Sequence, residues 1–244
     1  MGKDGSRAGT EAPLPLTATA KDIRRERLYG RRVGKPLRSA QQNLLETRLA
    51  ALSVADDGAV DLKALFPKAV RFAFEVGFGG GEHLAAQAQA HPDWGFVGCE
   101  PFINGAAKLV TEIERSKLDN IRLHMGDARE LMPRLPAGSL AAFYLLFPDP
   151  WPKARHHKRR FINDKNLDEI ARLLVTGGEL RVATDITDYA RWSLEHLMRH
   201  SAFRWAAEQA TDWRIRPGDW PATRYEQKAI REERVPIYLR FIRL

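Results

Sequence analysis

The sequence is short of cysteine and of long apolar runs. Cys99 is the single cysteine among 244 residues, which excludes an intrachain disulfide and a metal cluster held by cysteines. No apolar run approaches the roughly 18 residues of a membrane helix, and the amino terminus lacks the apolar centre of a secretory signal. Apolar residues still make up 44% of the chain, which is enough for a substantial core. We therefore expect a globular, cytoplasmic protein with no membrane association.

Acidic residues are scarce in three regions of a chain whose net charge is +8. Residues 1–38 contain ten Lys/Arg against four Asp/Glu, residues 151–163 contain five against none, and residues 204–244 contain nine against six. Residues 39–150 are instead acidic, with ten against fourteen. Cations gathered in an arm, a loop and a carboxyl-terminal region favour a surface for phosphates, and RNA is the partner that we expect. A solvated charged tail is the alternative for the arm.

Apolar runs alternate with amphipathic stretches from residue 70 onward. Runs typical of strands are 70–76, 95–100, 121–125, 140–147, 179–183 and 235–244, and stretches typical of helices are 39–51, 82–90, 102–117, 129–132, 161–175 and 186–200. Ser39 is the candidate cap of the first helix, and Gly177 and Gly178 are expected to close the helix 161–175. The alternation predicts an α/β fold with a doubly wound, mostly parallel sheet. We expect a flexible basic arm over residues 1–38 and a single domain over 39–244.

The glycine-rich stretch after the first expected strand lacks the third glycine of the dinucleotide-binding spacing. Counting from Gly77 and Gly79 places Glu82 where that glycine belongs. The run instead reads Glu75-x-Gly77-x-Gly79-x-Gly81, with a carboxylate two residues before the first glycine. A carboxylate is unfavourable beside a pyrophosphate, and it favours a ligand that carries an ammonium or a sulfonium group.

Further acids stand where successive strands end. Glu100 follows the second strand, Asp127 the third and Asp149 the fourth. The carboxyl ends of parallel strands meet at one edge of a sheet, where open α/β sheets bind ligands. Glu100 lies 23 positions after Gly77, about where an acceptor for ribose hydroxyls is expected, and Asp127 is a candidate acceptor for an adenine amino group. Any one of them could be an ordinary surface acid, because Asp is common in loops.

The stretch 147–160 combines one restricted carboxylate with a cationic strip. It reads Phe-Pro-Asp-Pro-Trp-Pro-Lys-Ala-Arg-His-His-Lys-Arg-Arg. Its prolines end the fourth strand, and two of them flank Asp149 and restrict its backbone. The cationic strip consists of Arg155, His156, His157, Lys158, Arg159 and Arg160. The stretch therefore indicates chemistry performed on a polyanion.

The same stretch resembles the signature of the tRNA guanine-N7 methyltransferases, a family of class I S-adenosylmethionine-dependent methyltransferases. The likeness also covers residues 75–84, 98–100, 126–127, 184–185 and 223–226, and more loosely 31–35. It implies a Rossmann-like sheet of seven strands with a reversed last strand. It also implies S-adenosylmethionine as methyl donor and S-adenosylhomocysteine as product. The implied substrate is the variable-loop guanine of tRNA, position 46 by convention.

The resemblance implies roles for individual residues as well. Contacts with the methyl donor fall to Glu75, Glu100, Asp127 and Asp149, beside the backbone of Gly77, Gly79 and Gly81. The residues implied to hold the substrate are Lys153, Asp185, Thr223, Arg224, Tyr225 and Glu226. The strip 155–160, together with Arg31 and Arg32 of the arm, is expected to contact RNA. The chain departs from the family pattern at Ala229 and Glu233, where glycines often follow the segment 223–226.

The expected chemistry needs alignment more than proton transfer. Guanine N7 has an in-plane lone pair and no proton, so it attacks a methyl group without a general base. Holding the reactants in line can supply roughly 7 to 11 kcal/mol in the best intramolecular models. Asp149 is the catalytic candidate, since a carboxylate stabilises the cation that develops on guanine, and Lys153 is a candidate donor to guanine O6. His156 and His157 are interpreted as phosphate-facing donors, because this chemistry requires no metal.

Two other functions stay open on the sequence. An RNA-binding protein of the same fold that has lost catalysis would explain the departure at Ala229 and Glu233. The second open function is that of an amino-group methyltransferase, because Asp149-Pro150-Trp151 resembles the Asp-Pro-Pro-Tyr/Trp motif of those enzymes. Trp151 is equally compatible with stacking on a base and with anchoring its loop in the core. Nothing in the sequence requires a protein partner.

Overall fold

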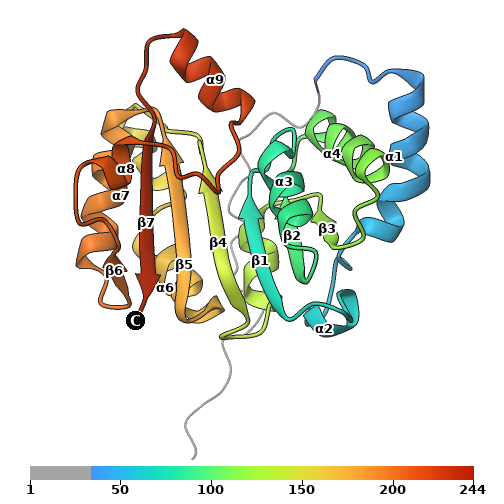
Figure 1. The fold of residues 1–244 in the computed structure, drawn as a ribbon, viewed down its shortest axis with the longest axis horizontal. Helices are drawn as coiled ribbons and strands as arrows, with labels where there is room; N and C mark the ends of the chain where they lie inside the picture. Colours follow the sequence, from blue (N-terminus) through green and yellow to red (C-terminus); the bar gives the residue numbers. More distant parts are fainter. Residues whose placement is uncertain (1–33) are drawn as a thin grey trace, which may run out of the picture.

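Seven strands form one sheet in the order β3-β2-β1-β4-β5-β7-β6 (Figure 1). The computed structural model describes residues 34–244. The strands are β1 (Arg71–Val76), β2 (Trp94–Cys99), β3 (Ile121–His124), β4 (Leu140–Leu146), β5 (Leu174–Thr184), β6 (Phe203–Trp205) and β7 (Ile237–Arg243). The neighbours from β3 to β5 are paired in parallel, whereas β7 runs antiparallel to both β5 and β6. The predicted mostly parallel sheet with a reversed last strand is confirmed.

Helices cover both faces of this sheet. They are α1 (Ser39–Leu52), α2 (Leu62–Leu65), α3 (Glu82–Ala90), α4 (Ile103–Ser116), α5 (Ala128–Leu131), α6 (Asp164–Leu173), α7 (Thr187–Arg199), α8 (Thr211–Arg214) and α9 (Arg224–Arg231), with the 3-10 turns η1 (Met132–Arg134) and η2 (Ala154–Arg159). In Figure 1, α1, α3 and α4 lie in front of the sheet beside β1 to β3, and α6 and α7 lie behind β5 and β7. The predicted double winding is therefore present.

Each face of the sheet has its own apolar core. Phe74 and Phe143 stack at 5.2 Å between ring centroids in the core closed by α6 and α7. Ala73 and Tyr144 instead belong to the core closed by α1, α3 and α4. Neighbouring residues of a strand point to opposite faces of the sheet. Because both faces are covered, β1 and β4 need apolar residues on both sides, and their sequences are nearly continuous apolar runs.

Helix α6 is shorter than the predicted helix 161–175. It is capped by the Asn163 side chain and passes directly into β5 at Leu174. Gly177 and Gly178 do not close the helix, because they lie within β5, where Gly177 has a φ of +81° and the register with β4 is irregular. That part of the prediction is wrong: the glycines accommodate a bend in a strand.

The ends of other elements also differ from the sequence expectation. Arg38, and not Ser39, occupies the cap position of α1, and its side chain makes no cap hydrogen bond. The sequence does not predict α2, β6, α8 or α9, which are too short to show apolar periodicity. Among the described helices, none is both long and apolar enough to cross a membrane.

Residues 206–223, which include the short helix α8, run from β6 across the front of the sheet to α9 (Figure 1). Trp220 of this segment is buried, and its ring packs edge-on against Tyr238 of β7 at 5.6 Å. The Arg181 guanidinium of β5 lies 5.6 Å from the centres of both the Trp220 ring and the Tyr144 ring of β4. The segment thus carries α9 to the edge where the parallel strands end.

Candidate functional site

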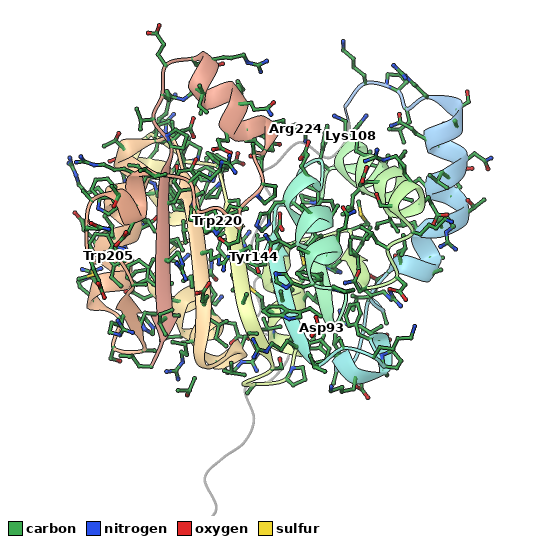
Figure 2. The ribbon with its side chains drawn as sticks, in the orientation of Figure 1. Asp93, Lys108, Tyr144, Trp205, Trp220 and Arg224 are labelled. Atoms are coloured by element: carbon green, nitrogen blue, oxygen red, sulfur yellow. The ribbon has the colours of Figure 1, made fainter. Side chains whose placement is uncertain are left out.

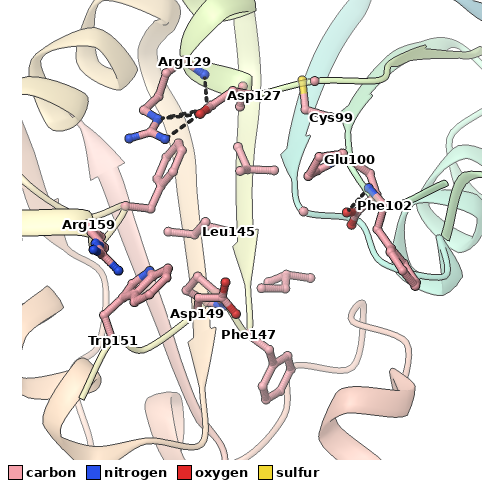
Figure 3. A pocket seen from close by; sticks show the side chains of 18 of the residues that line it. Cys99, Glu100, Phe102, Asp127, Arg129, Leu145, Phe147, Asp149, Trp151 and Arg159 are labelled. Carbon is pink, nitrogen blue, oxygen red and sulfur yellow. Dashed lines mark hydrogen bonds and ion pairs between the residues drawn. The ribbon is translucent and has the colours of Figure 1, made fainter. Parts of the chain in front are cut away.

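A cavity of about 440 Å³ lies at the carboxyl ends of β1, β2 and β4 (Figure 3). The chain order of the strands reverses between β1 and β4, which is the point where open α/β sheets bind ligands. Three of the four predicted acids line the cavity, namely Glu100, Asp127 and Asp149. Gly77 and Tyr225 line it as well, so the loop after β1 and the first turn of α9 meet there.

Glu100 is fixed at the cavity wall by two backbone amides. The Gly79 N–H donates to Oε2 at 2.7 Å, and the Phe102 N–H donates to Oε1 at 3.0 Å. Burial raises the pKa of Glu100 above its usual value, and these two amides partly oppose that rise because they favour the charged form. The carboxylate is therefore held in one orientation and keeps lone pairs that can accept from ligand hydroxyls.

The glycine loop owes its shape to left-handed backbone angles. Gly77, Gly79 and Gly81 have φ values of +68°, +58° and +80°, a region that glycine enters without a steric penalty. Gly81 is the cap residue of α3, so the loop turns directly into the amino terminus of that helix. The glycine spacing of the sequence is explained by this turn.

Asp127 is bound by a neighbouring guanidinium. Its Oδ1 and Oδ2 accept from Nε of Arg129 at 2.9 and 3.0 Å, and Oδ2 accepts from Nη2 at 2.5 Å (Figure 3). Oδ1 also accepts from the Arg129 N–H and so caps α5. The sequence analysis does not single out Arg129, although it stands two residues after an expected site acid at the start of a helix.

Asp149 lies on an exposed and constrained loop beside the cavity. Phe147 and Trp151, which stand two positions before and after it, are bulky and have φ values of +51° and +45°. Such angles are strained for aromatic residues and persist where the surrounding structure imposes them, often at functional sites. The Trp151 ring is covered by the Arg159 guanidinium at 4.9 Å (Figure 3). The loop therefore presents Asp149 in a narrow range of directions.

Glu75 is not among the residues that line the cavity. It is 2% exposed, and its Oε2 lies 2.7 Å from Nδ1 of His83 on α3. The structure places this carboxylate beneath the glycine loop, on the face of the sheet that α3 covers. Its contact with a methyl donor stays a prediction, and His83 is a partner that the sequence analysis does not identify.

Cys99 also borders the cavity but is only 1% exposed. Burial, and after it the charges of Asp127 and Glu100, raise the pKa of the thiol well above its usual value. The side chain is therefore a protonated core residue.

The predicted substrate segment 223–226 forms the start of α9. Thr223 and Glu226 make a reciprocal capping box, and they are 7% and 4% exposed. The Glu226 carboxylate also accepts from the Tyr238 hydroxyl at 2.5 Å and pairs with Arg216 at 3.0 Å. These contacts make both side chains supports of the start of α9, and their contact with the substrate stays a prediction.

Arg224 and Tyr225 are placed differently from their buried neighbours. Tyr225 is 43% exposed and lines the cavity, and Arg224 lies 3.7 Å from Glu82 at the start of α3. Asp185 pairs with Arg234 at 2.6 Å, and neither Asp185 nor Lys153 lines the cavity. The structure thus brings Tyr225 to the cavity, and the substrate roles of Lys153 and Asp185 stay predictions.

Only some side chains of the cationic strip are exposed. Arg155 and Lys158 are exposed on η2, which follows the Asp149 loop. Arg160 is 1% exposed, pairs with Asp188 and donates to the Pro150 carbonyl at 2.9 Å, so it supports the loop from within, and its contact with RNA stays a prediction. Its guanidinium also lies over the rings of two α7 residues, Tyr189 and Trp192.

The two histidines of the strip are also distinguished by their surroundings. Desolvation and then the charges of Arg159 and Arg155 lower the pKa of His156, so His156 is neutral at neutral pH. The His157 ring lies edge-on to Trp192 at 5.4 Å. Within residues 34–244, no group of three or more His, Cys, Asp or Glu side chains has the arrangement of a metal site. Arg31 and Arg32 of the predicted arm lie outside the described residues.

Fold and cavity together define the class: a class I methyltransferase, with a reversed last strand and a pocket where β1 meets β4. Solved structures share the fold. An aminoglycoside resistance methyltransferase, NpmB1, aligns with a TM-score of 0.51 and 19% identity over 75% of this chain and 92% of that chain. The 16S rRNA methyltransferase KamB aligns with a TM-score of 0.52 and 14% identity over 77% and 96%. At these identities the likeness shows the fold alone.

Sequence comparisons give the family within this class. Residues 70–238 match the family model described as "Putative methyltransferase". The tRNA (guanine-N(7)-)-methyltransferase of Rhodospirillum rubrum is 52% identical, covering 89% of this chain and 88% of its own. Those of Roseobacter denitrificans and Agrobacterium fabrum are 49% and 48% identical, covering 88% and 89% of this chain and 95% of their own. The chain belongs to the tRNA (guanine-N(7)-)-methyltransferase family and is an enzyme of that type.

Proposed function

We propose that this enzyme transfers a methyl group from S-adenosylmethionine to N7 of the guanine at position 46, in the variable loop of tRNA. The observation that carries the proposal is the cavity at the junction of β1 and β4, where Glu100, Asp127 and Asp149 converge. Exposed cations of η2 follow the Asp149 loop and supply the charge that RNA phosphates require. Family membership supports the same activity.

The residues of the cavity fit S-adenosylmethionine. Glu100 is oriented to accept from ribose hydroxyls, and Asp127 is placed at the next strand end for the adenine amino group. Gly77 lines the cavity with open space beside its Cα, which leaves room for the amino-acid end of the donor. An acidic pocket suits this molecule, because it carries an ammonium and a sulfonium and no phosphate.

The bound donor supplies an electrophilic methyl group. The guanine N7 lone pair forms the new N–C bond as the S–C bond breaks, and the bonding electrons pass to sulfur. No proton moves at N7, so the protein must hold the two reactants in line rather than act as a base. Asp149 lies where the cavity opens to the loop, and its carboxylate stabilises the positive charge that develops on guanine.

The same loop provides the means to recognise the substrate. Lys153 stands four residues after Asp149 and is exposed, so its ammonium is the donor proposed for guanine O6. Arg155 and Lys158 on η2 are the residues proposed to contact tRNA phosphates. Asp185 directly follows β5, is paired with Arg234 and is proposed to contact the substrate as well.

The experiment uses purified protein, S-adenosylmethionine and unmodified tRNA transcripts. We expect 7-methylguanosine in nucleoside mass spectrometry, and we expect none from a matched transcript in which guanine 46 is replaced by adenine. Methylation at an exocyclic amino group would instead support an amino-group methyltransferase. Binding of tRNA without any methylated product would show a protein that has lost catalysis.

A further inference from the structure

The docking segment, residues 216–225, is attached to α3 by polar contacts. The side-chain amide of Gln87 donates to the Asp219 carbonyl at 2.5 Å. One turn earlier on α3, Glu82 lies 3.7 Å from Arg224. These contacts join the helix that follows the glycine loop to the chain that leads into α9.

Trp220 is the centre of this attachment and is 3% exposed. Its ring lies edge-on to His83 at 6.3 Å and to Tyr238 at 5.6 Å, and the Arg181 guanidinium covers it at 5.6 Å. His83 in turn holds Glu75 at 2.7 Å. Among the described residues, Nε1 of Trp220 and Nε2 of His83 have no hydrogen-bond partner. The contact therefore depends on packing of the Trp220 ring, and a smaller side chain would leave part of its space empty.

Both sides of the contact reach the same cavity. Gly77 lies just before α3, Tyr225 lies just after the docking segment turns into α9, and both line the cavity. A Cβ atom at Gly79 would lie only 2.7 Å from the Tyr225 ring, so the tyrosine rests directly on the glycine loop. A ligand in the cavity contacts the glycine loop and α9 at once.

We propose that Trp220 is a positioning residue, which holds the start of α9 against α3 and so couples tRNA binding to methyl-donor binding. The proposal rests on the proposed function. A donor that touches both Gly77 and Tyr225 stabilises the docked arrangement, and that arrangement presents Arg224 and Tyr225 beside the Asp149 loop. By linkage, each ligand then strengthens the binding of the other by the same factor.

The test measures the dissociation constant of unmodified tRNA with and without saturating S-adenosylhomocysteine, using the full chain. In the wild-type protein we expect tRNA to bind roughly fivefold or more tightly when the ligand is present, as in typical coupled sites. Trp220→Leu should bring this ratio close to one. Trp220→Phe keeps an aromatic ring in the contact and should restore most of the ratio.

Trp205 provides the matched control. It is partly buried, its indole nitrogen also has no described hydrogen-bond partner, and its ring stacks on Phe241 of β7 at 6.3 Å. Figure 2 shows it on the side of the molecule away from α3, whereas Trp220 lies near Tyr144. Trp205→Leu should therefore lower the melting temperature without changing the coupling ratio.

Several outcomes overturn the inference. The inference is wrong if the wild-type protein binds tRNA equally well with and without S-adenosylhomocysteine. It is also wrong if the coupling ratio falls equally in Trp220→Leu and Trp205→Leu. If Trp220→Leu does not fold, Trp220→Met keeps an apolar side chain of intermediate size without the ring, and an unchanged ratio in that variant also overturns the inference. Failure of the proposed function is distinct, because the wild-type protein would then not bind S-adenosylhomocysteine in calorimetry or would yield no 7-methylguanosine.

Discussion

At the scale of single residues, the three acids of the cavity differ in what holds them. Two backbone amides fix Glu100, and the guanidinium of Arg129 fixes Asp127. Asp149 is exposed and is oriented by its backbone, since the residues on either side are prolines. The first two therefore form a rigid wall of the cavity, and Asp149 is held at its border by a constrained loop.

Replacing Asp149 by Ala is expected to reduce turnover by roughly 100- to 1,000-fold, the usual effect of removing one preorganised electrostatic group. The melting temperature should stay within about a degree of the wild-type value, because the side chain is exposed. Single-turnover kinetics with saturating donor and tRNA measure the effect. Asp164→Ala, which changes an exposed acid at the start of α6, is the control; equal turnover in the two variants would remove the assignment.

The sequence identifies the acids of the cavity because a general rule places them: the carboxyl ends of parallel strands lie together. The same rule does not reveal which other charged residues are buried, or what they pair with. Glu75 bonds to His83 on a helix, and Arg160 is enclosed by Tyr189 and Trp192, about 30 positions further along the chain. Burial of a charged side chain depends on such distant contacts, and the composition of the loop gives no sign of them.

At the scale of elements, α9 shows how one pattern can have two interpretations. The Thr-x-x-Glu pattern at Thr223 and Glu226 is a sequence signature of a helix start, and the structure contains that capping box. The sequence analysis associates the same residues with substrate binding and predicts no helix there. Long strands and helices are predicted well because their apolar period is clear, whereas an eight-residue helix with a polar surface depends on its cap.

Thr223→Ala should destabilise α9 locally. Loss of the cap costs about 1 kcal/mol, which corresponds to about a fivefold faster exchange of the α9 amide hydrogens that exchange by local opening. Hydrogen exchange followed by mass spectrometry measures it. Thr111→Ala is the control, because the Thr111 hydroxyl only bonds to the Ala107 carbonyl within α4. Unchanged exchange in α9 would show that the helix start is held by Glu226 and Tyr238 alone.

At the scale of the whole molecule, positive charge is distributed unevenly about the sheet. Arg155 and Lys158 are exposed next to the cavity, at the edge where the parallel strands end. Lys68 and Lys117 are exposed near the opposite edge, just before β1 and at the end of α4. The first pair is therefore expected to contact RNA, and the second pair is not.

Changing Arg155 and Lys158 together to Gln should weaken tRNA binding and flatten its dependence on salt. Each phosphate contact contributes roughly 0.7 to 0.9 to the slope of log K against log salt, so the slope should fall in magnitude by roughly 1.5. Titrations at several salt concentrations give the slope. Changing Lys68 and Lys117 to Gln should leave it as in the wild type, and an equal fall in both double variants would place the RNA elsewhere.

The buried thiol of Cys99 makes the molecule well suited to site-specific labelling. Because it is the single cysteine of the chain, and is enclosed and protonated, maleimide reagents meet no competing thiol on the folded surface. A cysteine introduced at Ile230, which is 58% exposed on α9, would carry one spin label or fluorophore. The position of α9 could then be followed in solution as donor and tRNA are added, without altering any residue of the cavity.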